Sequence, residues 1–190
     1  MNLPETFRSD DLVAARRVIR ENPFGSLISV VGGVPLVSHI PFVLDGDHII
    51  GHLARRNPHT RLLDGESLVT FVGPHAYVSA RWYTRPEAHV PTWNYVAVHV
   101  YGRPELIESA PAVRQLARLI EPEAATSPVV DALAPRVVAF RIPLDRVEFK
   151  AKLSQNREPM DAERVRVALD GGTESERAVA RWMEWARRGS

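Results

Sequence analysis

The dipeptide Asp45-Gly46, which separates two apolar runs, is the feature that most restricts how this chain can fold. A pair of this kind between alternating segments predicts a β-hairpin, because both central residues of a type I′ turn need a positive φ. With a two-residue turn around this pair, His39 lies directly opposite His52. We therefore expect a hairpin with one apolar face toward the core and one face that carries two imidazoles.

Turn signals and apolar periodicity extend this prediction to the whole chain. The pair Gly32-Gly33 marks another hairpin turn, and Gly73-Pro74 is expected to end a strand. The expected strands are Gly25–Val31, Val34–Leu44, His48–Leu53, Ser67–Val72, Thr92–Gly102, Val137–Ile142 and Val147–Ala151. The expected helices run from Ser9-Asp10-Asp11 to Asn22-Pro23 and over Pro111–Ile120, Asp161–Leu169 and Glu174–Arg188. The sequence thus predicts a mainly β, α+β fold in a single domain over residues 1–190, with one N-terminal helix and C-terminal helices.

The segment Thr92–Gly102 is the clearest strand, and its two faces differ in chemistry. One face carries Val96, Val98 and Val100, and the other carries Trp93, Tyr95, His99 and Tyr101. A valine face suits a barrel interior, whereas an aromatic face with polar tips suits an interface or a flat conjugated ligand. Packing of the aromatic rings under a helix is the alternative. Because the aromatic face needs cover from outside its own barrel, we expect an obligate homodimer.

Composition excludes several classes of protein. The chain has no cysteine, which excludes disulfides, thiolate metal sites and covalent haem attachment, so a protein ligand to a metal must be His, a carboxylate, Tyr or Met. A net charge of +1 without a long single-sign block gives no support to a nucleic-acid partner. Neither a signal-peptide pattern nor an apolar run of membrane-spanning length is present, so we expect no membrane partner and a cytoplasmic location.

A basic segment follows the second strand of the predicted hairpin: Arg55, Arg56, Asn57, Pro58 and His59. Asn57 is a good N-cap and Pro58 fits the first helical position, so a helix is expected to begin here. Free N–H groups, the positive end of the helix and two guanidinium groups would together hold a phosphate or a carboxylate. An ordinary surface helix preceded by solvated arginines is the alternative.

Several motifs, in order along nearly the whole chain, resemble the PaiB family of FMN-binding proteins, which are often described as negative transcriptional regulators. These motifs are HIPF, GHLARRNPH, GPHAYVSARWY, VPTWNYVAVHVYG and KLSQNR. The resemblance implies a split β-barrel of the flavin-reductase and pyridoxamine-phosphate-oxidase type, which forms homodimers and binds its cofactor at the dimer interface. By this resemblance Arg55 and Arg56 would hold the anionic tail of the cofactor. The other expected cofactor contacts are Ser38, His39, Ile40, Pro41, His52, His59, Trp93 and Asn94.

The same family contains the piperazate synthases, which are haem enzymes. FMN and haem b make the same electrostatic demand on the two arginines, but only haem needs an imidazole that reaches iron. His59 is our candidate for the metal ligand, because its place in the first helical turn lowers its pKa and favours the neutral, ligating form. A hydrogen bond at the helix start is the alternative role. The chain departs from the family pattern at Thr60, Arg81 and Asn2, where tryptophan, proline and tyrosine are usual, and the loss of an indole beside His59 makes room for a macrocycle.

The resemblance therefore implies a haem-dependent enzyme similar to piperazate synthase, which acts on an amino-acid substrate. Its reaction would be the redox-neutral, dehydrative cyclisation of N5-hydroxyornithine to piperazate, in which two nitrogens become bonded. The reaction needs a proton donor, for which His39 and His52 are candidates, and a partner for the substrate carboxylate, for which Arg81 and Lys152 are candidates. An FMN-binding oxidoreductase and a PaiB-type transcriptional regulator are the alternatives, although no helix-turn-helix signature or basic face supports the regulator.

Overall fold

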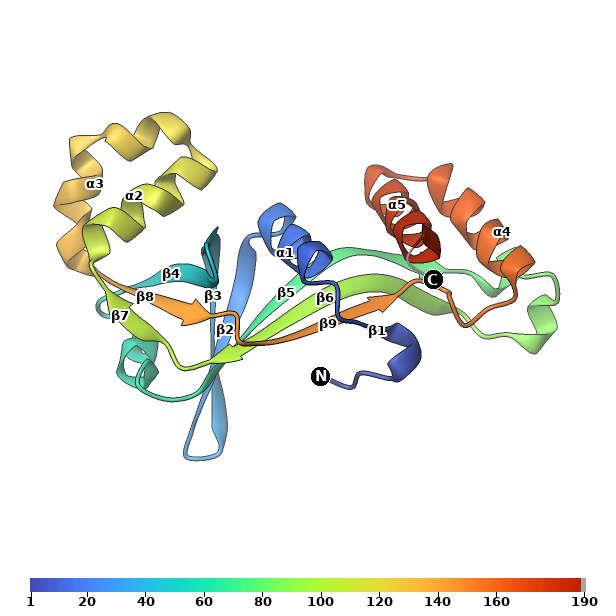
Figure 1. The fold of residues 1–190 in the computed structure, drawn as a ribbon, viewed down its shortest axis with the longest axis horizontal. Helices are drawn as coiled ribbons and strands as arrows, with labels where there is room; N and C mark the ends of the chain where they lie inside the picture. The colour runs from blue at the N-terminus through green and yellow to red at the C-terminus, as the bar shows by residue number, and fades with distance from the viewer. Residues whose placement is uncertain (189–190) are drawn as a thin grey trace. The chain divides into compact units, whose positions relative to one another are not determined.

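The computed structural model describes residues 1–188, and Figure 1 labels its helices and strands. The chain forms two compact units. The first unit contains Met1–Val18, Val72–Val98 and the chain from Glu148 onward, and the second contains Ile19–Phe71 and His99–Val147. Whether the chain behaves as a single domain stays a prediction. None of the helices in the described part of the chain is long and apolar enough to cross a membrane.

Strands dominate both units, and the mainly β prediction with flanking helices is confirmed. The strands are β1 (Arg8–Ser9), β2 (Phe24–Val31), β3 (Val34–Asp45), β4 (His48–Ala54), β5 (Ser67–Val78), β6 (Thr92–Gly102), β7 (Glu105–Ile107), β8 (Val137–Pro143) and β9 (Arg146–Lys152). Their hydrogen-bonded order is β1-β9-β6-β5-β2-β3-β4-β8-β7. The pairs β1–β9, β2–β3, β2–β5, β3–β4, β4–β8 and β7–β8 are antiparallel.

Most of the helices agree closely with their predicted ranges, and the exception is the short helix Pro128–Leu133, which is not among the expected helices. They are α1 (Leu12–Glu21), α2 (Ser109–Ile120), α3 (Pro128–Leu133), α4 (Pro159–Asp170) and α5 (Glu174–Arg188). Helix α1 begins where the sequence predicts, because the Asp11 carboxylate accepts a hydrogen bond from the backbone N–H of Ala14 at 2.9 Å. Short 3₁₀ segments lie between the larger elements, among them Pro58–Leu62, Ala80–Trp82 and Pro86–Ala88.

The core of the second unit is built around Phe42 of β3. Its ring meets Phe71 edge-on at a centroid distance of 5.6 Å and Phe140 at 6.2 Å. Glycines make room for this ring, because a Cβ on Gly51 would lie 2.8 Å from the Phe42 side chain, and one on Gly25 would lie 3.2 Å from it. On the opposite face of the strands, α2 places Ala112 and Leu116 on Ile50 and Ala139.

The first unit is held by apolar packing of α1 and α5 with strand residues. Trp182 and Trp185 of α5 meet edge to face at a centroid distance of 5.2 Å, and both contact Phe149 of β9. The guanidinium carbon of Arg17 lies 5.0 Å above the Trp182 ring. The two tryptophans therefore pack against the strands of this unit.

The register of the β3–β4 hairpin differs from the prediction by two residues. Asp45 pairs with His48, so the turn residues are Gly46 and Asp47. Gly46 has a φ of 52°, and Asp47 is not among the non-glycine residues with positive φ. A positive φ at the first central position alone is the pattern of a type II′ turn, whereas the prediction assumed type I′. The turn with two positive φ angles is instead Gly32-Gly33, between β2 and β3.

This register overturns the predicted pairing of His39 with His52. His39 pairs with Ser26 of β2. The strand β3 runs along β2 from Val34 to Pro41 and pairs with β4 only from Phe42 onward. His52 pairs with Ala139 of β8. The turn residues determine only the pairing next to the turn, and they do not show that β3 pairs with a different strand over most of its length.

The strand β5 is longer than the prediction. It continues through Gly73 and Pro74 to Val78, where the sequence suggested a break. Gly73 is buried in this strand, and a Cβ there would lie 2.7 Å from Val96 of β6. The glycine therefore marks a close approach of neighbouring strands rather than a turn. The strand β6 and its buried valine face match the prediction residue for residue.

Candidate functional site

The candidate site is centred on His59, which lies in the 3₁₀ segment Pro58–Leu62. The segment begins as the sequence predicts, because the Asn57 side chain accepts a hydrogen bond from the backbone N–H of His59 at 3.0 Å and Pro58 takes the first position. A 3₁₀ segment of five residues is too short to provide the extended helix end that the prediction assumed. The Asn57 side chain already accepts the backbone N–H of His59, which is one of the N–H groups that were expected to bind an anion.

The His59 imidazole is fully buried and bonded at both ring nitrogens. Nδ1 lies 2.9 Å from the Ser38 hydroxyl, and Nε2 lies 3.0 Å from the Ser29 hydroxyl. The chain of polar groups continues on both sides: the Asn57 amide donates to Ser38 at 3.3 Å, and Ser29 meets Ser67 at 2.7 Å. His59 thus sits in the middle of a buried hydroxyl–imidazole chain, which we define as Asn57, Ser38, His59, Ser29 and Ser67.

Burial lowers the pKa of His59 from its ordinary value of 6.5. The direction of this shift and the neutral imidazole agree with the prediction, but the cause is desolvation rather than the field of a helix end. A neutral imidazole in a water-poor place is the form that binds a metal.

A cavity of about 570 Å³ adjoins the Ser29 and Ser67 end of the hydroxyl–imidazole chain. Its apolar lining comes from Ile28, Val30, Leu62 and Leu68, and Tyr101 also borders it. The lining also includes two acidic residues, Asp64 and Glu66. Ser29 and Ser67 belong to the lining, and the Nε2 atom of His59 bonds to Ser29. One hydroxyl group therefore stands between the imidazole and the cavity.

The two arginines before this segment differ in role. Arg55 is exposed, but its Nε donates to the carbonyl of Pro135 at 2.9 Å and its Nη2 to that of Val137 at 3.0 Å. Arg55 therefore connects the end of β4 to the start of β8 through these hydrogen bonds. Only the rest of its guanidinium group is available to bind a ligand. Arg56 is exposed and remains a candidate for binding an anion. The role of both arginines at a cofactor stays a prediction.

The other histidines expected at the site, His39 and His52, are not members of the hydroxyl–imidazole chain. His39 is exposed on β3, and its Nδ1 lies 2.9 Å from the Ser26 hydroxyl. His52 is half-buried on β4, and its Nδ1 has no hydrogen-bond partner among the described residues. Burial lowers the pKa of His52, so this imidazole is also neutral near pH 7.

The remaining predicted contacts divide between the two units. Ile40 and Pro41 are half-buried on β3, in the second unit with His59. Trp93, Asn94, Arg81 and Lys152 belong to the first unit. Asn94 is 1% exposed and its amide is bonded to the hydroxyl of Ser154, so it supports a loop rather than lining an open surface. Trp93 is 51% exposed, and Arg81 is exposed beside the Ala80–Trp82 segment.

Sequence reasoning missed Ser29 and Ser67, the two hydroxyls on the cavity side of His59. A signal for Ser29 was present, because it shares the inward face of β2 with Gly25 and Leu27. A polar residue on a face that is otherwise buried needs a hydrogen-bond partner. The partner itself could not be identified, because His59 lies 30 residues further along the chain.

Comparisons with known proteins agree with this architecture. Residues 1–146 match the family model described as "Putative FMN-binding domain". The protein named "Protease synthase and sporulation protein PAI 2" from Bacillus subtilis is 35% identical over 178 residues, which cover 85% of each chain. This match confirms the resemblance to the PaiB family.

Two solved structures are similar in fold. The flavocytochrome Anf3 from Azotobacter vinelandii aligns with a TM-score of 0.66 at 18% identity, over 76% of this chain and 69% of that one. An FAD- and haem-binding protein from Mycobacterium smegmatis aligns with a TM-score of 0.64 at 18% identity, over 87% of this chain and 80% of that one. The fold is thus a split β-barrel, and the chain belongs to the family of FMN-binding-domain proteins that includes PAI 2.

Proposed function

We propose that this protein is a haem b-dependent enzyme that converts N5-hydroxyornithine to piperazate by forming a nitrogen–nitrogen bond. The observation that carries this proposal is His59: a fully buried, neutral imidazole whose Nε2 is one hydroxyl group away from a cavity of about 570 Å³. A flavin does not need an imidazole in this position, whereas histidine is a common ligand of a haem iron that has no thiolate ligand.

The residues around the cavity meet part of the demands of haem b, because its lining is mainly apolar but also holds the carboxylates Asp64 and Glu66, which would repel propionates. A haem needs an axial ligand, apolar contacts for its macrocycle and cations for its propionates. His59 can supply the nitrogen if the Ser29 hydroxyl turns away from Nε2, and the apolar lining of the cavity suits the ring. A neighbouring cavity of about 470 Å³ is lined by Arg61, Arg103 and the carboxylate Asp64, and its two arginines can supply positive charge.

The reaction is balanced without an external oxidant or reductant. The bond between N5 and its hydroxyl oxygen breaks, the α-nitrogen bonds to N5, and one water leaves. The iron of a bound haem would supply Lewis acidity or an electron reservoir for the departing hydroxyl. The chain itself must bind the haem, orient the substrate so that its chain folds back, and move one proton from the α-nitrogen to the leaving oxygen.

For this proton transfer we retain His39 and His52 as candidates, with different roles. His52 is neutral at pH 7 and its buried Nδ1 has no partner, so it suits a proton acceptor for the α-amine. His39 is exposed and stays the candidate for the proton donor. Arg81 and Lys152, which both belong to the first unit, stay the candidates for the partner of the substrate carboxylate.

An FMN-binding oxidoreductase is the second candidate, because the family model that matches residues 1–146 describes an FMN-binding domain. Flavin phosphate would use the same cations as haem propionates. A PaiB-type regulatory role would use either cofactor as a sensor. Identification of the bound cofactor would distinguish these functions before any activity is assayed.

The test is the absorption spectrum of the full chain purified from cells supplied with a haem precursor. We expect a Soret band in the wild type, its loss or a strong shift in His59→Ala, and an unchanged band in His48→Ala, a half-buried histidine at the hairpin turn. The same three proteins should then be incubated with N5-hydroxyornithine, with ring closure expected in the wild type and in His48→Ala. A flavin spectrum without a Soret band in the wild type contradicts the haem proposal and favours the FMN alternative. An unchanged Soret band in His59→Ala places the iron ligand elsewhere.

A further inference from the structure

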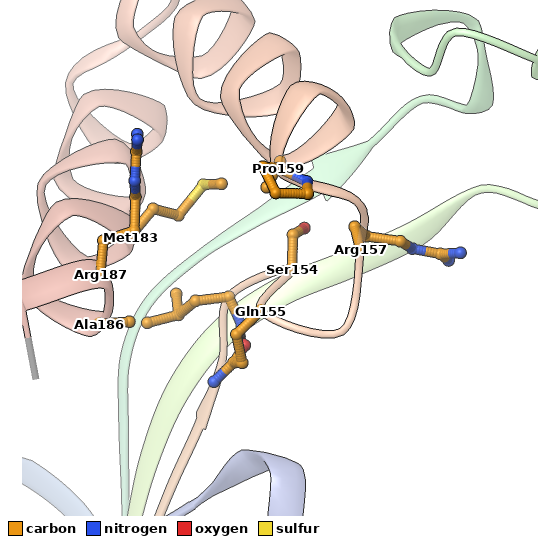
Figure 2. A pocket seen from close by; sticks show the side chains of 9 residues that line it. Ser154, Gln155, Arg157, Pro159, Met183, Ala186 and Arg187 are labelled. Atoms are coloured by element: carbon orange, nitrogen blue, oxygen red, sulfur yellow. Dashed lines mark hydrogen bonds between the residues drawn. The ribbon is translucent and has the colours of Figure 1, made fainter. Parts of the chain in front are cut away.

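Cavities in the two units differ in the charged groups that line them. A cavity of about 260 Å³ in the first unit, drawn in Figure 2, lies between the KLSQNR motif and the helices α4 and α5. Ser154 in this motif has a φ of 66°, the only positive φ of a non-glycine residue among residues 1–188, and its hydroxyl is bonded to the Asn94 amide. Arg187 forms an ion pair with Glu163, and the Arg157 side chain extends away from both helices. The polar groups around this cavity are therefore mostly paired with one another.

The cavity of about 570 Å³ beside His59 carries unpaired charge instead. All the residues that line it belong to the second unit. Asp64 and Glu66 are among them, and both are exposed. Among residues 1–188, no cationic nitrogen lies within 4.0 Å of either carboxylate. Two negative charges thus border a cavity that otherwise has mainly apolar walls.

Burial distinguishes an inner and an outer end of this cavity. Ser29 is 3% exposed and Ser67 is 2% exposed, so their hydroxyls lie at the inner end, where Ser29 is bonded to the His59 imidazole. The exposed Asp64 and Glu66 lie at the opening. The walls are completed by three half-buried apolar side chains: Ile28, Leu62 and Leu68. The ligand that suits this cavity is apolar along its length and positively charged at its outer end.

The backbone holds the two carboxylates at the opening. The N–H of Gly65 donates to the carbonyl of Leu62 at 3.2 Å, which closes a turn around Asp64. Glu66 follows this turn and directly precedes Ser67, the first residue of β5, whose hydroxyl meets Ser29 at 2.7 Å. Both ends of the short acidic segment are therefore anchored.

The two carboxylates differ in what else they face. Asp64 also lines the neighbouring cavity of about 470 Å³, together with Arg61 and Arg103. Glu66 is not among the residues that line that neighbouring cavity. The charge of Glu66 therefore acts mainly on the cavity beside His59, whereas the charge of Asp64 is shared with two guanidinium groups.

We propose that the cavity beside His59 binds an alkylammonium group, the α-ammonium group of the amino acid on which the protein acts. The inference rests on the proposed function for the identity of that amino acid. A carboxylate bonds an ammonium group through charge-assisted hydrogen bonds, and the apolar walls cover methylene groups. The same carboxylates repel haem propionates, so they leave this opening to a cationic substrate.

The experiment is a calorimetric titration of the full chain as purified, with three probes: n-pentylamine, pentan-1-ol and L-ornithine. The first two have the same carbon chain, and only the amine is positively charged at neutral pH. The variants are Glu66→Gln, Asp64→Asn and the double variant. Glu121→Gln is the control, because Glu121 is an exposed carboxylate in the same unit that does not line this cavity. The thermal unfolding midpoint of each variant is recorded, and unchanged binding of pentanol shows that the cavity is intact.

We expect the wild type to bind pentylamine at least about fivefold more tightly than pentanol, a modest factor because the carboxylates are exposed. Added salt should reduce this preference. Glu66→Gln should remove most of it, Asp64→Asn should remove less, and Glu121→Gln should behave as the wild type. Ornithine should bind the wild type and lose affinity in Glu66→Gln by a similar factor.

Two results overturn the inference. If the wild type binds pentylamine and pentanol equally tightly, or if the double variant keeps the preference for the amine, the carboxylates do not bind an ammonium group. If pentylamine binding depends on Glu66 but ornithine does not bind, the assignment of the cavity to an amino acid is wrong. Because these titrations use neither haem nor turnover, they can succeed or fail independently of the Soret band.

Discussion

Among single residues, His59 and His52 couple the stability of the fold to pH. Burial lowers the pKa of both imidazoles from 6.5. Above pH 6.5 both are neutral in the folded and unfolded chains, so their contribution to stability is complete. As the pH falls below 6.5, the unfolded chain takes up protons that the folded chain resists. The free energy of unfolding therefore decreases as the pH falls toward the folded pKa values.

This effect can be measured by urea unfolding of the wild type and of the double variant His52→Gln, His59→Gln between pH 5.5 and 7.5. The double variant should be less stable at pH 7.5, because Ser29 and Ser38 lose a buried partner, at a cost of about 1–3 kcal/mol. Its stability should also depend less on pH than that of the wild type. His39→Gln, which changes an exposed histidine, serves as the control. Parallel pH profiles for the wild type and the double variant would contradict the assignment.

The left-handed Ser154 gives a second prediction at this scale. Ser154→Ala removes the hydrogen bonds with Asn94 and keeps the positive φ, whereas Ser154→Gly removes the same bonds but relieves the backbone strain. We expect both variants to be destabilised, and the alanine variant to be less stable than the glycine variant by about 1 kcal/mol. Thermal or urea unfolding measures this difference. Equal stability of the two variants would show that the chain does not retain this φ in solution.

Among the elements, β3 and β4 show what the sequence can predict and where it stops. The dipeptide Gly32-Gly33 and the single residue Gly46 locate the two hairpin turns, because few residues other than glycine take a positive φ. The two-residue error in the β3–β4 register arose because Asp45-Gly46 and Gly46-Asp47 are both acceptable turns. Nothing local decides between them, and the choice is made by packing of Phe42 against distant strands.

This packing can be tested through Gly51. A Cβ at this position would lie 2.8 Å from the Phe42 ring, so Gly51→Ala should destabilise the protein by about 1–3 kcal/mol through overpacking. The double variant Gly51→Ala, Phe42→Leu should be more stable than the sum of the two single effects, since leucine leaves room for the new methyl group. A double-mutant cycle by urea unfolding measures the coupling. Strict additivity would mean that Gly51 is not in contact with Phe42.

The candidate site could be predicted only in part, because some of its contacts are local in sequence and others are not. Asn57, Pro58 and His59 form a local motif, and their capping geometry follows from short-range preferences. The partners of His59 come from β2 and β3, and Ser67 of β5 bonds to one of them, Ser29; no local rule connects these strands to His59. The role of Arg55 in binding the carbonyls of Pro135 and Val137 also depends on a strand that lies 80 residues away.

For the whole molecule, the aromatic face of β6 supports association of two copies of the chain. Trp93 is 51% exposed and contacts Tyr77, which is 46% exposed. Exposed aromatic clusters of this kind are typical of interfaces. We expect a homodimer by light scattering at micromolar concentration, and a shift toward monomer in the variant Trp93→Ser, Tyr77→Ser. A folded wild-type monomer at this concentration would contradict the prediction.

The buried hydroxyl–imidazole chain described above also has a direction. The Asn57 carbonyl oxygen accepts from the His59 backbone, so its amide must donate to Ser38, and the Ser38 proton is then free to point at Nδ1 of His59. If the Ser38 hydroxyl donates to Nδ1, the ring proton resides on Nε2 and is donated toward Ser29, whose own proton can point toward Ser67. A metal at Nε2 would displace that proton to Nδ1 and reverse the polarity of the Ser38 contact. Nitrogen-15 resonances of the imidazole, recorded with and without haem, would report this exchange of tautomers directly.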